Sequence, residues 1–212
     1  MSRSTPSRRR RSRGAAALEA ALVTPLIVTM LFGIIEMSFL LKDNVALTSS
    51  VRLGGRTASA NAGAGPGATD DAGDCISPCS GNNVPKLAVL AANAIQRGGS
   101  ALPEDSITEM WVYKANNKGY PGSDGSTTMT CGPNCVKFSW NKTKNQFRYL
   151  SGSWTSSTIN ACPGTGDAVG IYMKANHAFL TGLLGSTIAI DDRAVFAFEP
   201  LDPGACASGQ HL

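Results

Sequence analysis

The sequence is poor in the residues from which most enzyme active sites are built. Among its 212 residues are only two histidines, His177 and His211, and the second is one residue from the end. It has no GxSxG elbow, P-loop, HExxH motif or dinucleotide-binding glycine pattern. We therefore expect no catalytic residue, no cofactor and no metal site. A membrane-anchored hydrolase is the least favoured class of function, and His177 is expected to be a turn histidine.

Basic residues are not in excess once the first 14 residues are set aside. Six of the 19 basic residues are arginines between positions 3 and 13, so the rest of the chain has 13 basic and 15 acidic residues. A nucleic-acid-binding domain usually spreads basic residues over a folded face and intersperses aromatic side chains. This charge distribution predicts no nucleic-acid partner.

A long run without basic residues follows the arginines. Residues 15–41 contain Glu19 and Glu36 as their only charged residues. A helix of this length spans about 40 Å, enough for a bilayer core of roughly 30 Å. A cleavable secretory signal is disfavoured because its apolar region is usually only about 7–15 residues long. By the positive-inside rule, residues 1–14 are expected in the cytoplasm and residues beyond about 42 outside.

The two glutamates in this run need an explanation, because a charge at the centre of a membrane helix costs on the order of 3 kcal/mol. If the chain is cut after Gly14, the new amine of Ala15 lies one helical turn from Glu19. The amine of one subunit can then pair with Glu19 of a neighbour. Glu19 can instead extend to the lipid headgroups. For Glu36, near the outer boundary, interfacial solvation is favoured over a specific contact.

Pro25 predicts a kink in the same helix, because it removes an amide donor and clashes with the preceding turn. The hydroxyl of Thr24 is expected to satisfy freed backbone groups. The combination of a basic leader, Gly14, Glu19 at the fifth position after it and an apolar helix with Pro25 resembles the TadE-like family of tight-adherence (type IVc) pilus proteins. The resemblance continues in Leu47-Thr48 and in the spacing Arg52-x-Gly54-x-Arg56.

The resemblance implies a minor pilin or pseudopilin of the bacterial inner membrane, cut by a prepilin peptidase between Gly14 and Ala15. Glu19, Pro25 and Glu36 are then the candidate assembly residues. The implied partners are the prepilin peptidase, other pilins of the filament, the inner-membrane assembly platform and the lipid bilayer. The alternative is a permanently anchored extracytoplasmic binding or adhesion protein, in which the helix is only a tether.

The sequence predicts an α+β fold beyond the membrane. Residues 42–61 are expected to continue the helix outward until Gly54-Gly55 weaken it, with Arg52 and Arg56 on one basic face. That face can meet phosphates, a neighbouring subunit's acids or only solvent. Residues 62–74 are rich in Gly, Ala and Asp and are expected to form a linker. Residues 75–212 are expected to form the outer domain.

Within the outer domain the spacing of apolar residues predicts one helix and an antiparallel sheet. The helix covers residues 84–95, with Asn83 as its cap and Gly98-Gly99 as its stop. Strands are expected at 107–113, 136–140, 146–150, 168–175 and 188–198.

Six cysteines follow the apolar run, and their location outside the cytoplasm favours disulfides over a zinc site. Sequence alone does not select among the fifteen possible pairings. We expect each close couple to pair locally and the last two cysteines to pair with each other. The expected bonds are Cys75–Cys79, Cys131–Cys135 and Cys162–Cys206.

Overall fold

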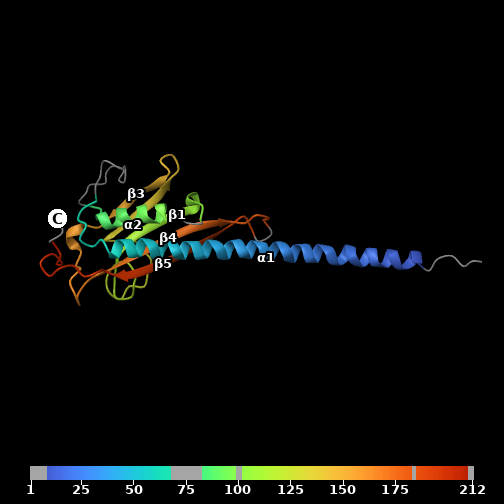
Figure 1. Cartoon of the computed structure of the whole chain (residues 1–212), viewed down its shortest axis with the longest axis horizontal. Coiled ribbons are helices and arrows are strands. Elements are labelled where there is room, and N and C mark those ends of the chain that lie inside the picture. The colour runs from blue at the N-terminus through green and yellow to red at the C-terminus, as the bar shows by residue number, and fades with distance from the viewer. Residues whose placement is uncertain (1–8, 68–82, 99–101, 183–184, 210–212) are drawn as a thin grey trace, which may run out of the picture.

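One long helix joins an extended stalk to a compact domain. The structure, a computed structural model, describes residues 9–67, 83–98, 102–182 and 185–209. Helix α1 (Arg9–Ser59) runs without interruption through both parts. Its C-terminal part packs into the domain, whereas its N-terminal part projects alone (Figure 1). The apolar part of α1 is long enough to cross a membrane.

The projecting part of α1 exposes apolar side chains on all of its sides. A helix that is apolar all round is expected to be buried in protein or in a membrane. The described part of the chain leaves this stretch uncovered, which favours the membrane. The exposed large apolar residues between Leu18 and Leu41 are Leu18, Leu22, Val23, Leu26, Ile27, Val28, Met30, Leu31, Phe32, Ile34, Ile35, Met37, Phe39 and Leu41.

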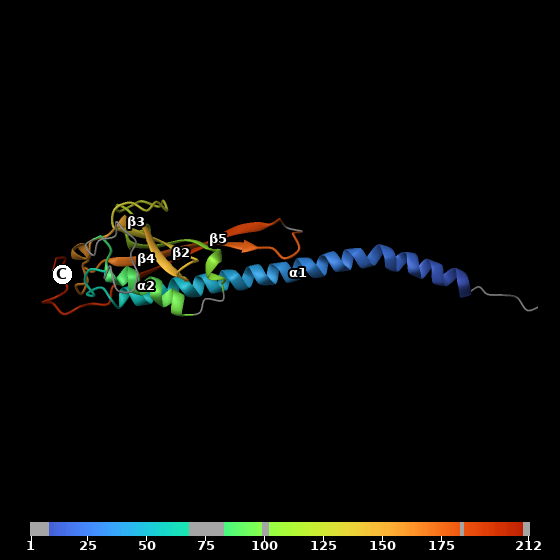
Figure 2. The ribbon, with the colours of Figure 1, turned by 90° about the horizontal axis from the view of Figure 1, so that it is seen from above.

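The stalk is bent rather than straight. Figure 2 shows α1 changing direction within its N-terminal half, the half that contains Pro25. The helix remains continuous through the proline. The hydroxyl that bonds to the backbone here belongs to Thr29, which donates to the Pro25 carbonyl oxygen at 2.8 Å. This bond reaches the carbonyl of Pro25 itself, whereas the carbonyl that loses its amide donor to the proline is that of Ala21. The contact expected from Thr24 is therefore not found among the described residues.

The domain contains a five-stranded antiparallel sheet and a second helix, so the fold is α+β. The order of the strands across the sheet is β3-β2-β1-β4-β5. Consecutive strands β2 and β3 form one hairpin, and β4 and β5 form another. The elements are α2 (Lys86–Arg97), β1 (Ile107–Ala115), β2 (Cys135–Asn141), β3 (Gln146–Ser153), β4 (Ala168–Ala178) and β5 (Thr187–Ala197), with short 3-10 helices at Glu104–Ser106 and Ser156–Thr158.

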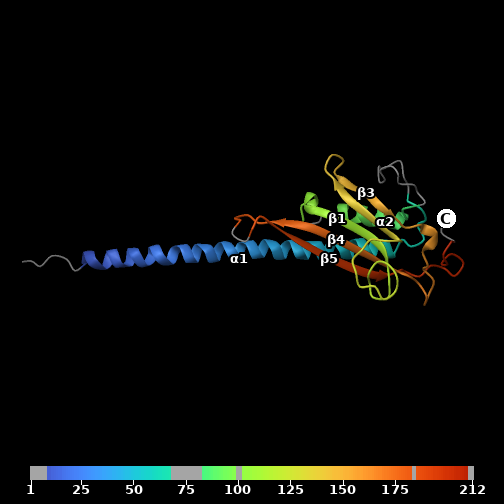
Figure 3. The ribbon, with the colours of Figure 1, turned by 180° about the vertical axis from the view of Figure 1, so that it is seen from behind.

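Both helices pack on one face of this sheet. Seen from behind, the strands lie in front of α1 and α2 (Figure 3). Leu47 and Val51 of α1, together with Ile95 of α2, are buried against Met110 and Ile171 of the central strands. The core of the domain therefore includes α1 from Ala46 onward, and the projecting apolar stretch and the domain core share one continuous helix.

Gly54 and Gly55 do not weaken α1. A side chain at Gly54 would lie 2.7 Å from the end of Ile95, and one at Gly55 would overlap the ring of Phe196. The two glycines are buried within the last two turns of a continuous helix and let it approach α2 and β5 closely. Tertiary packing thus outweighs their low helix propensity, which is about 1 kcal/mol each relative to alanine.

The opposite face of the sheet has a smaller apolar cluster. Trp111 and Tyr113 of β1 pack there with Cys135 and with Met129 from the preceding loop. The disulfide Cys131–Cys135 anchors that loop to the start of β2.

A second disulfide, Cys162–Cys206, ties the C-terminal segment to the loop before β4. These two bonds are the pairings expected for their four cysteines. Cys75, Cys79 and residues 68–74 of the expected linker lie outside the described residues.

The start of α2 differs from the expectation. Pro85, not Asn83, precedes the first helical residue, and no side chain caps the helix. The carbonyl oxygen of Asn83 instead accepts the amide of Trp154 at 2.8 Å. Proline suits the start of a helix because the backbone N–H groups there have no acceptor within the helix, so the N–H that proline lacks is not missed.

Candidate assembly helix and membrane-proximal site

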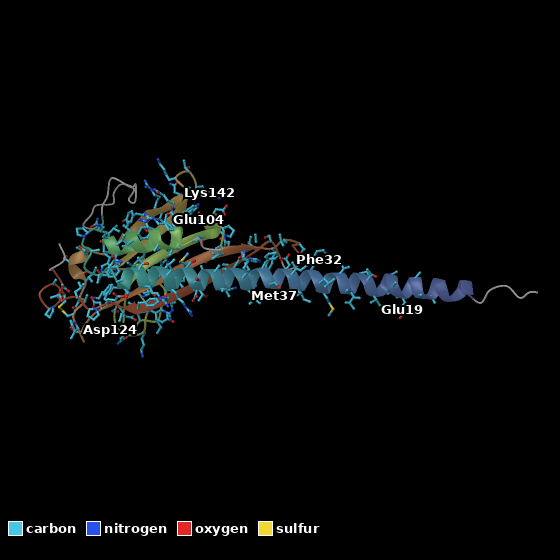
Figure 4. The ribbon with its side chains drawn as sticks, in the orientation of Figure 1. Glu19, Phe32, Met37, Glu104, Asp124 and Lys142 are labelled. Atoms are coloured by element: carbon cyan, nitrogen blue, oxygen red, sulfur yellow. A yellow bond between two sulfur atoms is a disulfide. The ribbon has the colours of Figure 1, made fainter. Side chains whose placement is uncertain are left out.

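The residues around the expected cleavage point are exposed on the bare end of α1. Gly14, Ala15 and Glu19 are all exposed. Glu19 lies far out on the stalk (Figure 4). A side chain built at Gly14 would meet no atom within 4 Å. Among the described residues, Glu19 has no hydrogen-bond or ion-pair partner, so its carboxylate is available to another molecule.

Glu36 has a different environment, because the tip of the β4–β5 hairpin covers it. Its Oε2 accepts the Leu180 amide at 3.0 Å. Its Oε1 accepts the Thr181 amide at 2.6 Å and the Thr181 hydroxyl at 2.7 Å. The side chain is 0% exposed. The sequence favoured interfacial solvation for Glu36, and that expectation is wrong because three protein donors replace water.

A second contact joins the same hairpin to α1 on the domain side of Glu36. Asp43 Oδ2 lies 2.6 Å from His177 Nδ1, and His177 is 4% exposed. His177 is a residue of β4 and not of a turn, which corrects the sequence-based expectation. The ring also packs edge-on against Phe179, with centroids 5.1 Å apart. The burial and the carboxylate partner indicate a structural pair.

Together the two contacts fasten the hairpin along α1. Asp43 and Glu36 are seven residues apart, which is about 10 Å of helix. His177 lies near the end of β4 and Thr181 follows four residues later, a distance of at most about 13 Å if the chain were fully extended. The similar spacings let the hairpin run beside the helix, and both views of the ribbon show it extending along α1 towards the stalk (Figures 1 and 2).

Arg52 and Arg56 lie on one exposed face of α1. Both line an open groove of ≈ 590 Å³ with Asn44, Val45, Thr48, Ser49 and Leu53. In the described parts of the chain neither guanidinium has a carboxylate partner. The groove is therefore a basic surface on the side of α1 that the sheet leaves uncovered.

No local sequence pattern indicates the two hairpin contacts. Glu36 and Thr181 are separated by 145 positions, and Asp43 and His177 by 134. Only the packing of α1 against the β4–β5 hairpin brings these residues together. Lys42 and Asp43 looked like a neutral pair at the end of the apolar run, whereas Asp43 in fact contacts a histidine.

The described residues thus form one long apolar helix that emerges from a small disulfide-bonded α+β domain. Residues 14–56 match the family described as TadE-like protein. The match covers the stalk, both glutamates and the basic face, and it ends where α1 is embedded in the core. It supports a pilin-like protein associated with a tight-adherence pilus and anchored through its N-terminal helix. Comparisons with curated proteins and with solved structures found no significant match.

Proposed function

We propose that this protein is a minor pilin or pseudopilin of a tight-adherence type IV pilus system. A prepilin peptidase removes residues 1–14 at the cytoplasmic face of the inner membrane. The mature protein then joins other pilins through its N-terminal helix and the assembly platform, and it presents the disulfide-bonded domain outside. The TadE-like match at residues 14–56 supports the family assignment on which this proposal rests.

The exposure of Glu19 is the observation that favours assembly over simple anchoring. Glu36, in the same apolar run, has three donors from its own chain, so its desolvation is offset internally. Glu19 has none among the described residues and stays exposed. After cleavage, the amine of Ala15 lies about 6 Å along the axis from Glu19, and the amine of a neighbouring subunit provides the missing partner.

The role of Glu19 is tested by the Glu19→Gln variant, which keeps the size of the side chain and removes its charge. The expected result is a normal amount of protein in the membrane and loss of the protein from sheared filaments. Glu104→Gln is the matched control, because Glu104 lies on the domain at the other end of the molecule (Figure 4). Unchanged incorporation of Glu19→Gln would favour the anchored binding or adhesion protein instead.

Processing is tested independently by Gly14→Leu. Because a Cβ at Gly14 would have no neighbour within 4 Å among the described residues, the variant is expected to affect recognition by the peptidase and not folding. Gly33→Leu is the control, since a side chain at Gly33 also has no neighbour within 4 Å. We expect only the Gly14 variant to accumulate uncut. Equal cleavage of both variants would place the cut elsewhere.

A further inference from the structure

The end of the β4–β5 hairpin has no charged residue apart from the buried His177. No Asp, Glu, Lys or Arg occurs between Lys174 and Asp191. Among the described residues of this stretch, Leu180 is 70% exposed and Ile188 is 43% exposed. An apolar tip that points outward is unusual for a hairpin surrounded by water, where turns are usually polar.

The depth of this tip along α1 is fixed by its contacts. Leu180 and Thr181 donate their amides to Glu36, so the tip lies at the level of that residue. Glu36 follows Ala15 by 21 positions, which is about 32 Å of helix. A bilayer core is about 30 Å thick. If Ala15 lies at the inner boundary of the core, the tip lies at the outer boundary.

The apolar surfaces of the hairpin and the helix are continuous. Phe32 and Ile35 of α1 are exposed on the stalk beside the level of Glu36. Phe32 lies close to the end of the hairpin (Figure 4). The first charged residues of α1 beyond Glu36 are Lys42 and Asp43. The hairpin contacts Asp43 through His177. Beyond that contact, its residues towards the stalk carry no charge.

We propose that the tip of the β4–β5 hairpin inserts into the outer leaflet of the membrane beside α1, with Leu180 among the acyl chains. The polar groups of the described tip suit this depth. The Leu180 and Thr181 amides and the Thr181 hydroxyl are bonded to Glu36, which in turn has its carboxylate satisfied without water. Unsatisfied polar groups would be costly in the bilayer, and the bonds to Glu36 avoid that cost for these three donors.

The insertion gives the domain a second attachment to the membrane. A single helix would let the domain rotate over the surface, whereas a helix and a hairpin side by side fix which face meets the lipid. The proposal requires only that α1 spans a bilayer. It does not depend on cleavage after Gly14 or on filament assembly.

The test places a tryptophan at the tip by Leu180→Trp in the full chain. The matched control is Leu150→Trp, because Leu150 is 56% exposed on β3, within the domain. Both variants replace exposed leucines, and circular dichroism checks that each is folded. The proteins are reconstituted in phosphatidylcholine vesicles with or without bromine on the acyl chains. The emission of the unsubstituted protein, which contains Trp111, Trp140 and Trp154, is subtracted.

We expect the added emission of Leu180→Trp to be blue-shifted and mostly lost in the brominated vesicles, and that of Leu150→Trp to be unchanged. Equal, weak quenching of both variants would overturn the proposal, since the tip would then lie in water. Blue-shifted emission that bromine does not quench would also overturn it, because a second protein copy would then cover the tip.

Discussion

The Oδ2 atom of Asp43 and the Nδ1 atom of His177 lie 2.6 Å apart, joining the long helix to the strand that returns beside it. Within the described residues, the Nε2 atom of His177 is buried without a partner. The imidazole therefore depends on Asp43 for its polar contact. This pair holds the base of the hairpin, and Glu36 holds its tip.

Replacing Asp43 should loosen the hairpin. Asp43→Ala leaves the buried imidazole unpaired, at a cost of about 1–3 kcal/mol in the free energy of unfolding. Denaturant unfolding of the detergent-solubilised protein measures this loss. Asp202→Ala is the control, because Asp202 is exposed near the C-terminus. Equal stability of the two variants would show that the pair contributes nothing.

Replacing Glu36 should release the tip specifically. In Glu36→Gln one carboxylate oxygen becomes an amide donor and faces a donor of Leu180 or Thr181, which leaves a buried group unsatisfied. We expect faster hydrogen exchange at the amides of residues 180 and 181, with the amides of β1 still protected. Exchange followed by mass spectrometry or NMR reports this directly. Unchanged exchange at the tip would mean that water can replace Glu36.

Replacing the buried Gly55 of α1 should destabilise the domain, whereas replacing the exposed Gly33 should not. Gly55→Ala brings a methyl group into the ring of Phe196 and should destabilise the domain by roughly 1–3 kcal/mol. Gly33→Ala, in the exposed stalk, adds a methyl group without any contact and should not lower the melting temperature. If both substitutions have the same effect, α1 does not need the close approach at Gly55.

The two disulfides should differ in their contribution to stability. Cys162 and Cys206 are 44 positions apart, whereas Cys131 and Cys135 are four apart. Chain entropy then predicts a loss of about 4 kcal/mol when the first bond is removed and about 2 kcal/mol when the second is removed. Unfolding of the two double serine variants compares these losses. The reverse order would show that native contacts, and not loop length, dominate.

Periodicity and composition predicted the fold well because its elements are locally encoded. The apolar run of residues 15–41 lies within one helix, and each of the five alternating segments overlaps a strand of the sheet. The predictions failed where distant residues decide the outcome. Gly54 and Gly55 looked like helix breakers until Ile95 and Phe196 were seen to fill the space beside them.

The candidate site was predictable only in part for the same reason. Gly14, Ala15 and Glu19 stand out by their order along one helix, and the family match covers them. The surroundings of Glu36 depend on a hairpin more than 140 positions away. No local pattern could have shown that its carboxylate is buried.

The central claim is that the chain is cut after Gly14, and the mass of the N-terminal peptide of the mature protein tests it most directly. Protein purified from its native membrane and digested should yield an N-terminal peptide that begins at Ala15, because cleavage after Gly14 creates the amine that pairs with Glu19. An N-terminus at Met1, or one near Ala60 after signal-peptidase cleavage, would contradict the account.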